Sequence, residues 1–379
     1  MTEAASSSPP DPAADHDAVT SLTDRIGWVH ARVRHQHPRV HRIAIALYDG
    51  RSDTLRTYVD SSDIDQPLAF YECTLARVPS LLELAHNHAF RIIDDLTGLP
   101  APHGEHTLWL IAQGYRSSYT VPLYRPGGLL GFLFFNSREP GRFHGRLLQD
   151  LPIHVQLCRQ AVLDVVDLSR AVGDRARTAQ GTAHRRHTET VRHLDRLSSY
   201  SRVIAKGVAR QCGRSDEFVE QVYQFAPLHD IGEIGVADTI LLKPERLTDE
   251  ERQTMQRHVE HGAQLVEDVM RSSSQAGRPG LQLLHNLVLC HHEFLDGSGY
   301  PRGLSGDAIP LEARIVTVAD IFDALTSERP YRHVCSNDEA LAELQRMADA
   351  GKLDPQCVAA LRDAGDEVQA SQQRFGLSA

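Results

Sequence analysis

Histidines and carboxylates recur at suggestive spacings through the second half of the chain. His229 and Asp230 are adjacent in LHDIGEIGV, and Glu189 and His193 are four residues apart in TETVRH. On a helix that spacing places both side chains on one face, one turn apart. Further candidates follow in MQRHVEHG, in CHHEFLDGSGYP and on a predicted helix that begins near Leu311. The eight candidate metal ligands are Glu189, His193, His229, Asp230, His258, His291, His292 and Asp320.

This donor set points to metal-dependent hydrolysis of a phosphoester. Imidazole and carboxylate ligands without thiolates suit iron, manganese or zinc. A bound metal ion lowers the pKa of water to about 7 and so supplies hydroxide, while several ions together clamp phosphoryl oxygens. The chain contains 21 histidines, and any single one is more often a surface or core residue than a ligand. The interpretation therefore rests on the ordered set.

The same segments resemble the HD-GYP family, the subset of HD phosphohydrolases defined by a GYP tripeptide, here Gly299, Tyr300 and Pro301. The resemblance covers about half of the chain and runs through ETVRH, LHDIGEIGVADTILLKPERLTDEE, MQRHVEHG, HHEFLDGSGYPRGLSGDAIPLEARIVTVADIFDALTSERPYR and LDPQCVAAL. It implies an all-helical bundle around two or three divalent metal ions, with iron favoured and manganese the alternative. It also implies hydrolysis of cyclic di-GMP or a related cyclic dinucleotide to linear pGpG or GMP.

The resemblance assigns roles by position. Asp230 is expected to bridge two ions and, with His229, to form the catalytic pair, whereas Glu189 and His193 match the additional ligands of three-metal members. Tyr300 is expected to stack on the substrate or to hydrogen-bond it. Asp323 could orient a ligand from behind, although a cap or a surface pair is an equal alternative. Arg329 and Arg332 match positions that contact substrate phosphate, with surface salt bridging as the alternative.

One position departs from the family. Most members have a lysine three residues after the aspartate of the HD pair, and this chain has Glu233. A carboxylate there would repel charge that develops on phosphate unless it is protonated or bound to metal. We therefore expect reduced but real activity, with an inactive cyclic-dinucleotide receptor or interaction module as the alternative. A hydrolase acting on another nucleotide is a third possibility.

The first half of the chain has the pattern of a mixed α/β domain. A helical stretch from Asp24 to Arg34 precedes two strand-like runs, RIAIALYDG and TLRTYVDSS, and a second strand pair is expected at Ser117–Leu123 and Leu129–Phe135. This order, with the ending GGLLGFLFFNSREPGRF, resembles a GAF sensor domain. Such domains bind a small ligand or serve only for dimerisation, and both alternatives stay open.

The expected fold class is a two-domain α+β protein. It comprises a disordered tail over 1–20, an α/β GAF-like sensor domain over 21–150, a linking helix over 151–180 and an all-α HD-GYP domain over 181–379. On the linking helix a heptad-like seam predicts a homodimer, with packing on its own GAF domain as the alternative. The seam consists of Leu151, Val155, Cys158, Val162, Val165, Ser169 and Val172.

The composition of the chain argues against several classes of binding partner and indicates where the protein is located. Forty basic and 50 acidic residues give a net charge of −10 without a concentrated Lys/Arg block, which argues against binding a nucleic acid polymer. No apolar run approaches the roughly 18 residues of a membrane helix, and the N-terminus does not have the pattern of a secretory signal. The six cysteines show no CxxC spacing, so we expect neither a disulfide framework nor a thiolate zinc site, and a cytoplasmic location.

Overall fold

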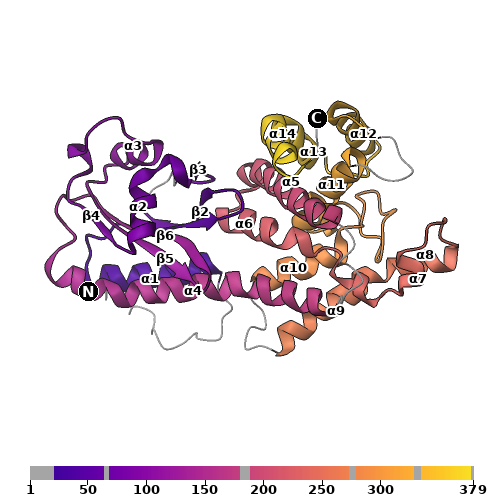
Figure 1. Cartoon of the computed structure of the whole chain (residues 1–379), viewed down its shortest axis with the longest axis horizontal. Helices are drawn as coiled ribbons and strands as arrows, with labels where there is room; N and C mark the ends of the chain where they lie inside the picture. The colour runs from indigo at the N-terminus through magenta and orange to yellow at the C-terminus, as the bar shows by residue number, and fades with distance from the viewer. Residues whose placement is uncertain (1–20, 64–67, 180–187, 273–278, 328–333, 377–379) are drawn as a thin grey trace, which may run out of the picture.

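The chain forms an α/β domain and an all-helical domain, which are joined by a long helix (Figure 1). The computed structural model describes residues 21–63, 68–179, 188–272, 279–327 and 334–376. This arrangement confirms the expected α+β class. The predicted tail over 1–20 lies outside the described residues. Within the described part, no helix has the length and apolar character to cross a membrane.

The N-terminal domain contains an antiparallel sheet of six strands in the order β3-β2-β1-β6-β5-β4. Both predicted strand pairs are confirmed as hairpins, because β1 pairs with β2 and β5 pairs with β6. The strands are β1 Arg42–Asp49, β2 Thr54–Ser62, β3 Glu72–Thr74, β4 Arg91–Ile93, β5 Ser117–Arg125 and β6 Gly128–Ser137.

Helices cover both faces of this sheet. Helices α1 (Leu22–Gln36) and α4 (Gly145–Ala179) pack their apolar side chains on one face, and α2 (Pro79–Asn87) packs on the other with η1 (Leu75–Arg77). The segment that carries η2 (Leu96–Gly98) and α3 (Glu105–Ala112) completes the second layer. In Figure 1, α1 and α4 lie side by side along the bottom of the domain, and α4 continues beneath the helical domain.

Residues of the predicted seam on α4 pack against other parts of the same chain. Leu151, Val155, Cys158 and Val162 are buried in the core that α4 shares with α1 and the sheet. These four residues therefore follow the alternative in which the helix packs on its own N-terminal domain, because a helix with this apolar periodicity can equally well make an intramolecular contact. The side chains of Ser169 and Val172 lie outside the described part.

The C-terminal domain is a bundle of helices around a main apolar core, to which α5, α6, α9, α10, α11, α12, α13 and α14 contribute. Its elements are α5 Thr188–Cys212, α6 Asp216–Phe225, η4 Ala226–Leu228, η5 Ile231–Gly235, α7 Asp238–Leu241, α8 Asp249–Gln256, α9 His258–Ser272, α10 Pro279–Cys290, η6 Gly306–Ala308, α11 Leu311–Thr326, α12 Asn337–Asp349, α13 Pro355–Asp363 and α14 Gly365–Arg374.

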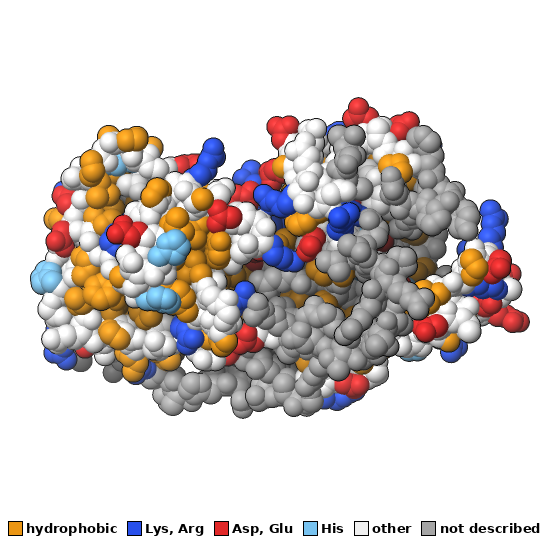
Figure 2. Space-filling view, in the orientation of Figure 1, with side chains coloured by type: hydrophobic (Ala, Val, Ile, Leu, Met, Phe, Trp, Pro, Cys, Tyr) orange, Lys and Arg blue, Asp and Glu red, His pale blue; other side chains and the backbone are white. Residues whose placement is uncertain are grey.

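Direct polar contacts join the two domains. The Glu217 carboxylate on α6 accepts hydrogen bonds from the backbone N–H groups of Leu22 and Thr23, each at 2.9 Å. These donors belong to the first turn of α1, where backbone N–H groups have no partner within the helix. Figure 2 shows charged side chains gathered near the boundary of the domains, whereas hydrophobic side chains are frequent on the N-terminal domain. The two domains are thus held together through specific groups.

Candidate metal centre

Separate elements of the helical domain bring seven of the candidate ligands together. Glu189, the eighth, lies in the first turn of α5, but its side chain is outside the described part. The seven candidate ligands are His193 on α5, His229 and Asp230 between η4 and η5, His258 at the start of α9, His291 and His292 directly after α10, and Asp320 on α11.

The ligand atoms form two groups, each with its atoms within 4.8 Å of one another, one with Asp230, His258, His291 and His292 and the other with His193, His229 and Asp320. Asp230 lies between the groups. Its Oδ2 is 2.9 Å from Nε2 of His229, and its Oδ1 is 3.2 Å and 3.3 Å from Nε2 of His258 and His291. Two ligands at right angles, each about 2.1 Å from one ion, lie about 3.0 Å apart. These spacings fit a carboxylate shared by two ions.

Backbone carbonyls fix the orientation of three imidazoles. Nδ1 of His229 donates to the carbonyl of Ala226 at 3.0 Å, and Nδ1 of His258 donates to Met255 at 2.8 Å. Nδ1 of His291 likewise donates to Val288 at 3.0 Å. In the neutral imidazole, a proton on Nδ1 leaves Nε2 with its lone pair for a metal ion, and all three Nε2 atoms are buried without a hydrogen-bond partner. This second-sphere arrangement is typical of metal-bound histidine.

The electrostatics of the centre favour a cation. Burial opposes a charge on His229, but the Asp230 carboxylate outweighs burial and raises the pKa of His229 to about 10. The balance is similar at His258, whose pKa is also raised. Burial prevails at His291 and His292, whose pKa values are lowered. Asp230 thus attracts positive charge into a ring of largely desolvated imidazoles.

A buried carboxylate and arginine position His193. Its Nδ1 lies 2.6 Å from Oδ2 of Asp323, and Nε of Arg196 donates to Oδ1 of the same carboxylate at 2.6 Å. Arg196 and Asp323 are 0% and 1% exposed. With Nδ1 engaged, Nε2 of His193 faces Asp320, whose Oδ1 is 3.9 Å away. Asp323 therefore stands behind His193, in the position that the sequence analysis proposed for it.

The GYP segment packs against the centre. The Tyr300 ring stacks on the His292 ring at a centroid distance of 4.7 Å and lies 6.5 Å from the His258 ring. Buried Glu293 holds the loop, because its two carboxylate oxygens accept the backbone N–H groups of Arg302 at 2.8 Å and Leu304 at 3.0 Å. A Cβ at Gly299 would lie 2.5 Å from backbone atoms of residues 292–294, so this position accommodates only glycine.

Glu233 lies on η5 at the edge of the centre. Burial, and then the neighbouring Asp230 carboxylate, raise the pKa of Glu233 to about 7. The turn that carries it runs very close to α9, since a Cβ at Gly232 would lie 1.9 Å from the carbonyl oxygen of His258. The carboxyl group thus lies near the candidate ligands, at the position where most members of the HD-GYP family, which this segment resembles, have a lysine.

Two predicted residues cannot be compared with the structure, and three supporting residues were missed. Arg329 and Arg332 lie outside the described residues. Sequence reasoning did not identify Arg196 or Glu293, and it also missed Thr317, whose hydroxyl donates to the His291 carbonyl at 2.7 Å. Arg196 could have been noticed three residues after His193 on the same helix face. Glu293 and Thr317 carry no comparable local signal.

Comparisons with known proteins show which family and which curated relatives the helical region resembles. Residues 184–357 match the family model described as HD domain. The chain is 47% identical over 169 residues to the cyclic di-GMP phosphodiesterase response regulator RpfG of Xanthomonas campestris, which covers 44% of this chain and 41% of that protein. It is 44% identical over 168 residues to the cyclic di-GMP phosphodiesterase of Thermotoga maritima, covering 44% and 42%.

A third relative carries a different name. The 3'3'-cGAMP-specific phosphodiesterase 3 of Vibrio cholerae is 40% identical over 175 residues, covering 46% of this chain and 35% of that protein. The chain thus spans less than half the length of each of these curated relatives.

Solved structures similar to the N-terminal part include GAF domains. A phycoerythrobilin-bound GAF domain from a cyanobacterial phytochrome is 19% identical, covers 38% of this chain and 87% of its own, and has a TM-score of 0.31. The GAF domain from an Acinetobacter phosphoenolpyruvate-protein phosphotransferase is 15% identical, covers 42% and 89%, and has a TM-score of 0.31.

Proposed function

Since residues 184–357 form an HD domain, we propose that this chain is a metal-dependent phosphodiesterase. Its substrate would be cyclic di-GMP or a related cyclic dinucleotide, and its product linear pGpG or GMP. Relatives that match the helical region are named as cyclic di-GMP or 3'3'-cGAMP phosphodiesterases, which supports this substrate class.

One observation carries the proposal. Three buried imidazoles present their Nε2 atoms within 3.3 Å of the same carboxylate, and none of these Nε2 atoms has a hydrogen-bond partner. Buried polar atoms without a partner are costly. A divalent cation between the rings and Asp230 would satisfy all of them at once, so the donor set fits metal ions better than a polar core.

We assign the roles of the residues as follows. His258, His291 and His292 would hold one ion, His193, His229 and Asp320 would hold a second, and Asp230 would bridge the two. When bound, the ions would supply a hydroxide nucleophile at neutral pH and polarise the phosphoryl oxygens. Asp323 would keep His193 in the tautomer that leaves Nε2 free.

Further assignments concern substrate and metal. Tyr300 borders the centre and would contact a base or a phosphate, and Arg329 and Arg332 are proposed as phosphate ligands. Glu189 is proposed as a ligand of a third ion. Nitrogen and oxygen donors without thiolate suit iron, which we propose as the native metal, with manganese as the alternative.

The remaining proposals concern assembly and regulation. We propose a homodimer in the cytoplasm, regulated by a small ligand of the N-terminal domain. Exposed Trp28 on α1 and exposed Ile153 and Leu157 on α4 supply an apolar surface on the outer helices. Ile153 and Leu157 are four residues apart and share one face of α4.

The test is a hydrolysis assay with matched variants. The protein is purified anaerobically and loaded with ferrous iron or with manganese, and products from cyclic di-GMP and from 3'3'-cGAMP are separated by chromatography. We expect linear dinucleotide or GMP with the parent and none with Asp230→Ala. The control is His285→Gln, because His285 lies on α10 and contacts Glu267 away from the two ligand groups. Equal activity of Asp230→Ala and the parent would refute the proposal.

Glu233 favours a second candidate, a cyclic-dinucleotide receptor. In that case the loaded protein binds the dinucleotide tightly, and neither metal supports turnover. A Glu233→Lys variant separates the candidates further. A large gain in turnover identifies an enzyme slowed by the carboxylate, whereas unchanged turnover and metal content show that this position does not affect the chemistry.

A further inference from the structure

The N-terminal domain encloses a cavity of about 510 Å³ between the sheet and the segments that carry α2 and α3. This volume lies within the range of pockets that bind small organic molecules, about 300–1,000 Å³. Much of the wall is apolar and includes Leu55, Ile93, Leu110 and Phe134. The cavity is far in the sequence from the metal ligands and plays no part in the chemistry proposed above.

The charged groups of the wall have one sign. Among the described residues that line the cavity there are three arginines, Arg42, Arg77 and Arg91, and two histidines, His103 and His106, but neither aspartate nor glutamate. Burial, followed by the charges of Arg42 and Arg91, lowers the pKa of His106 to about 3, so this ring is neutral. Among the described residues, the charged side chains that line the largely apolar cavity are thus all cationic.

Arg91 differs from Arg42 in lacking a counter-charge. Arg42 donates to the Asp60 carboxylate at 2.7 Å and to the Asn136 side chain at 2.7 Å. Within the described part of the chain, Arg91 forms no ion pair, and its Nε is buried without a hydrogen-bond partner. Burial alone lowers the pKa of Arg91. A half-buried guanidinium without an acceptor is unfavourable, and a carboxylate or phosphate group would relieve this cost.

We propose that this cavity binds a small organic anion with an apolar body, and that its occupancy acts on the metal centre through strands β2 and β3; the second part rests on the regulation by a ligand proposed above. The anionic group pairs with Arg91, and the apolar part contacts the leucine, isoleucine and phenylalanine side chains of the wall. The ligand class follows from the wall, and the route to the metal centre follows from the contacts that the same strands make with α5 and α6.

One side chain belongs both to the cavity and to the domain boundary. Thr57 on β2 lines the cavity, and its hydroxyl donates to Oδ1 of Asp216 on α6 at 3.1 Å. The backbone N–H of Phe70 donates to the same oxygen at 2.7 Å, and that of Tyr71, another lining residue, donates to the Thr57 hydroxyl at 3.1 Å. A ligand that displaces Thr57 or Tyr71 therefore perturbs hydrogen bonds to α6 directly.

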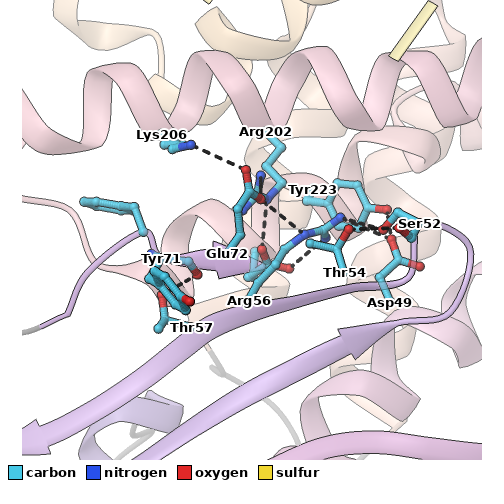
Figure 3. Close-up of polar contacts among 12 residues, drawn as sticks. Asp49, Ser52, Thr54, Arg56, Thr57, Tyr71, Glu72, Arg202, Lys206 and Tyr223 are labelled. Carbon is cyan, nitrogen blue, oxygen red and sulfur yellow. Dashed lines mark hydrogen bonds and ion pairs between the residues drawn. The ribbon is translucent and has the colours of Figure 1, made fainter. Parts of the chain in front are cut away.

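Strand β3 makes the second connection, shown in Figure 3. Tyr71 and Cys73 line the cavity, whereas Glu72 between them points to α5, where its carboxylate pairs with Arg202 at 2.8 Å and with Lys206 at 3.6 Å. Burial raises the pKa of Glu72, but these two cations and Arg56 outweigh burial and hold it below the usual value. Alternation along the strand thus places ligand contacts and interdomain ion pairs on successive residues.

Arg56 extends this contact to α6. Its guanidinium lies over the Tyr223 ring at 4.4 Å, and its NH1 is 3.6 Å from the Glu220 carboxylate, which also accepts from Arg202 at 3.1 Å. Figure 3 shows Arg56, Glu72 and Arg202 converging between the strands and the two helices. These partly buried charges are joined in one network, so moving one partner disturbs the others.

Helices α5 and α6 each connect the domain boundary to candidate metal ligands. Helix α5 carries Arg202 and, nine residues earlier, His193, which is about 14 Å along a continuous helix. Helix α6 carries Tyr223, and the chain continues through η4 directly to His229. A shift of α5 or α6 at the boundary is therefore transmitted to ligands of both groups.

Binding is tested on the full-length protein by calorimetry. The probes are benzoate, indole-3-acetate, octanoate and phenyl phosphate, each compared with its neutral counterpart, benzamide, indole-3-acetamide, octanamide and phenol. We expect at least one anion to bind about tenfold or more tightly than its counterpart, because a charged pair with Arg91 is lost in the neutral molecule. Arg91→Gln should remove this preference. The control Arg116→Gln, at an exposed arginine paired with Asp95, should retain it. Equal binding of all pairs, no binding by any anion, or an unchanged preference in Arg91→Gln would overturn the proposal.

The effect of cavity occupancy on the helical domain is tested by amide hydrogen exchange, a measurement that does not depend on turnover. The anion found by calorimetry should change amide exchange in α5 and α6 of the parent and of Asp63→Asn, a control at a surface pair with Arg34. Glu72→Gln should bind the anion as the parent does but lose most of this change. An unchanged exchange in the parent, or the same change in Glu72→Gln, contradicts the coupling. Because no catalytic readout is used, these outcomes are independent of whether the proposed hydrolysis occurs.

Discussion

Replacing Glu233 by glutamine tests whether its surroundings raise the pKa of this carboxyl group and thereby lower the stability of the metal-free protein at neutral pH. Burial and Asp230 raise the pKa of Glu233 from 4.5 to about 7. Below pH 4.5 the folded and the unfolded chain both hold the proton, so Glu233 does not affect their difference. Between pH 4.5 and 7 the folded chain keeps a proton that the unfolded chain releases, and the free energy of unfolding falls as the pH rises.

The magnitude follows from the same pKa values. One pKa unit corresponds to about 1.4 kcal/mol, so above pH 7 the buried carboxylate costs the metal-free protein about 3 kcal/mol. Glutamine has nearly the same shape and carries no charge. Metal-free Glu233→Gln should therefore match the parent near pH 4.5 and exceed its free energy of unfolding by up to about 3 kcal/mol near pH 8.

Urea unfolding of both proteins across this pH range measures the difference. All other titrating groups are common to both proteins, so the difference reports position 233 together with its effect on neighbours such as Asp230 and His258. Bound cations favour the carboxylate, and loading with manganese should therefore reduce the gain or reverse it. A difference that is constant with pH in the metal-free proteins would refute the reasoning, because it would place Glu233 in a solvated environment.

Three further predictions concern the groups behind the ligands. Asp323→Asn should weaken metal binding about 10- to 100-fold, because His193 loses the carboxylate that orients it, and titration against a chelator measures the loss; unchanged affinity would contradict this. Gly232→Ala should lower the free energy of unfolding by about 1–3 kcal/mol in thermal unfolding, since the new Cβ would clash with the His258 carbonyl. The control Gly365→Ala, with no atom within 4 Å of the new Cβ, should be nearly neutral in the same assay. Glu293→Gln replaces one acceptor of the GYP loop by a donor, and it should raise KM for the dinucleotide more than it lowers kcat; an effect on kcat alone would argue against a positioning role.

Local patterns in the sequence were sufficient for β1, β2, β5 and β6 but not for the short strands β3 and β4, and they also gave the order of the candidate ligands. The strand-like runs RIAIALYDG and TLRTYVDSS flank the turn-rich stretch DGRSD and so predict a hairpin, and β1 and β2 pair as expected. Adjacent or helical spacing also anticipated the His229–Asp230 pair and the place of His193 on α5. Resemblance to a family, however, was needed to combine these scattered residues in one site.

Long-range contacts could not be predicted in this way. The seam on α4 illustrates the limit, because Cys158 and Val162 have the periodicity of a dimer contact but lie in the core of their own domain. Glu217 and Asp216 appeared as ordinary acidic residues at a helix start, yet they bind α1 and the β2–β3 segment of the other domain. Their partners are more than 140 residues away in the sequence, and no local pattern connects them.

The two ligand groups differ in how easily mutation can alter them. Main-chain carbonyls orient His258 and His291 of the Asp230 group, and a carbonyl is present whatever side chain the position carries. His193 instead depends on the side chains of Asp323 and Arg196, either of which a single base change can replace. The Asp230 group should therefore persist as related sequences diverge, whereas the His193 group can be gained or lost in one evolutionary step. Metal stoichiometry would then be a more variable inherited trait than the binding site itself.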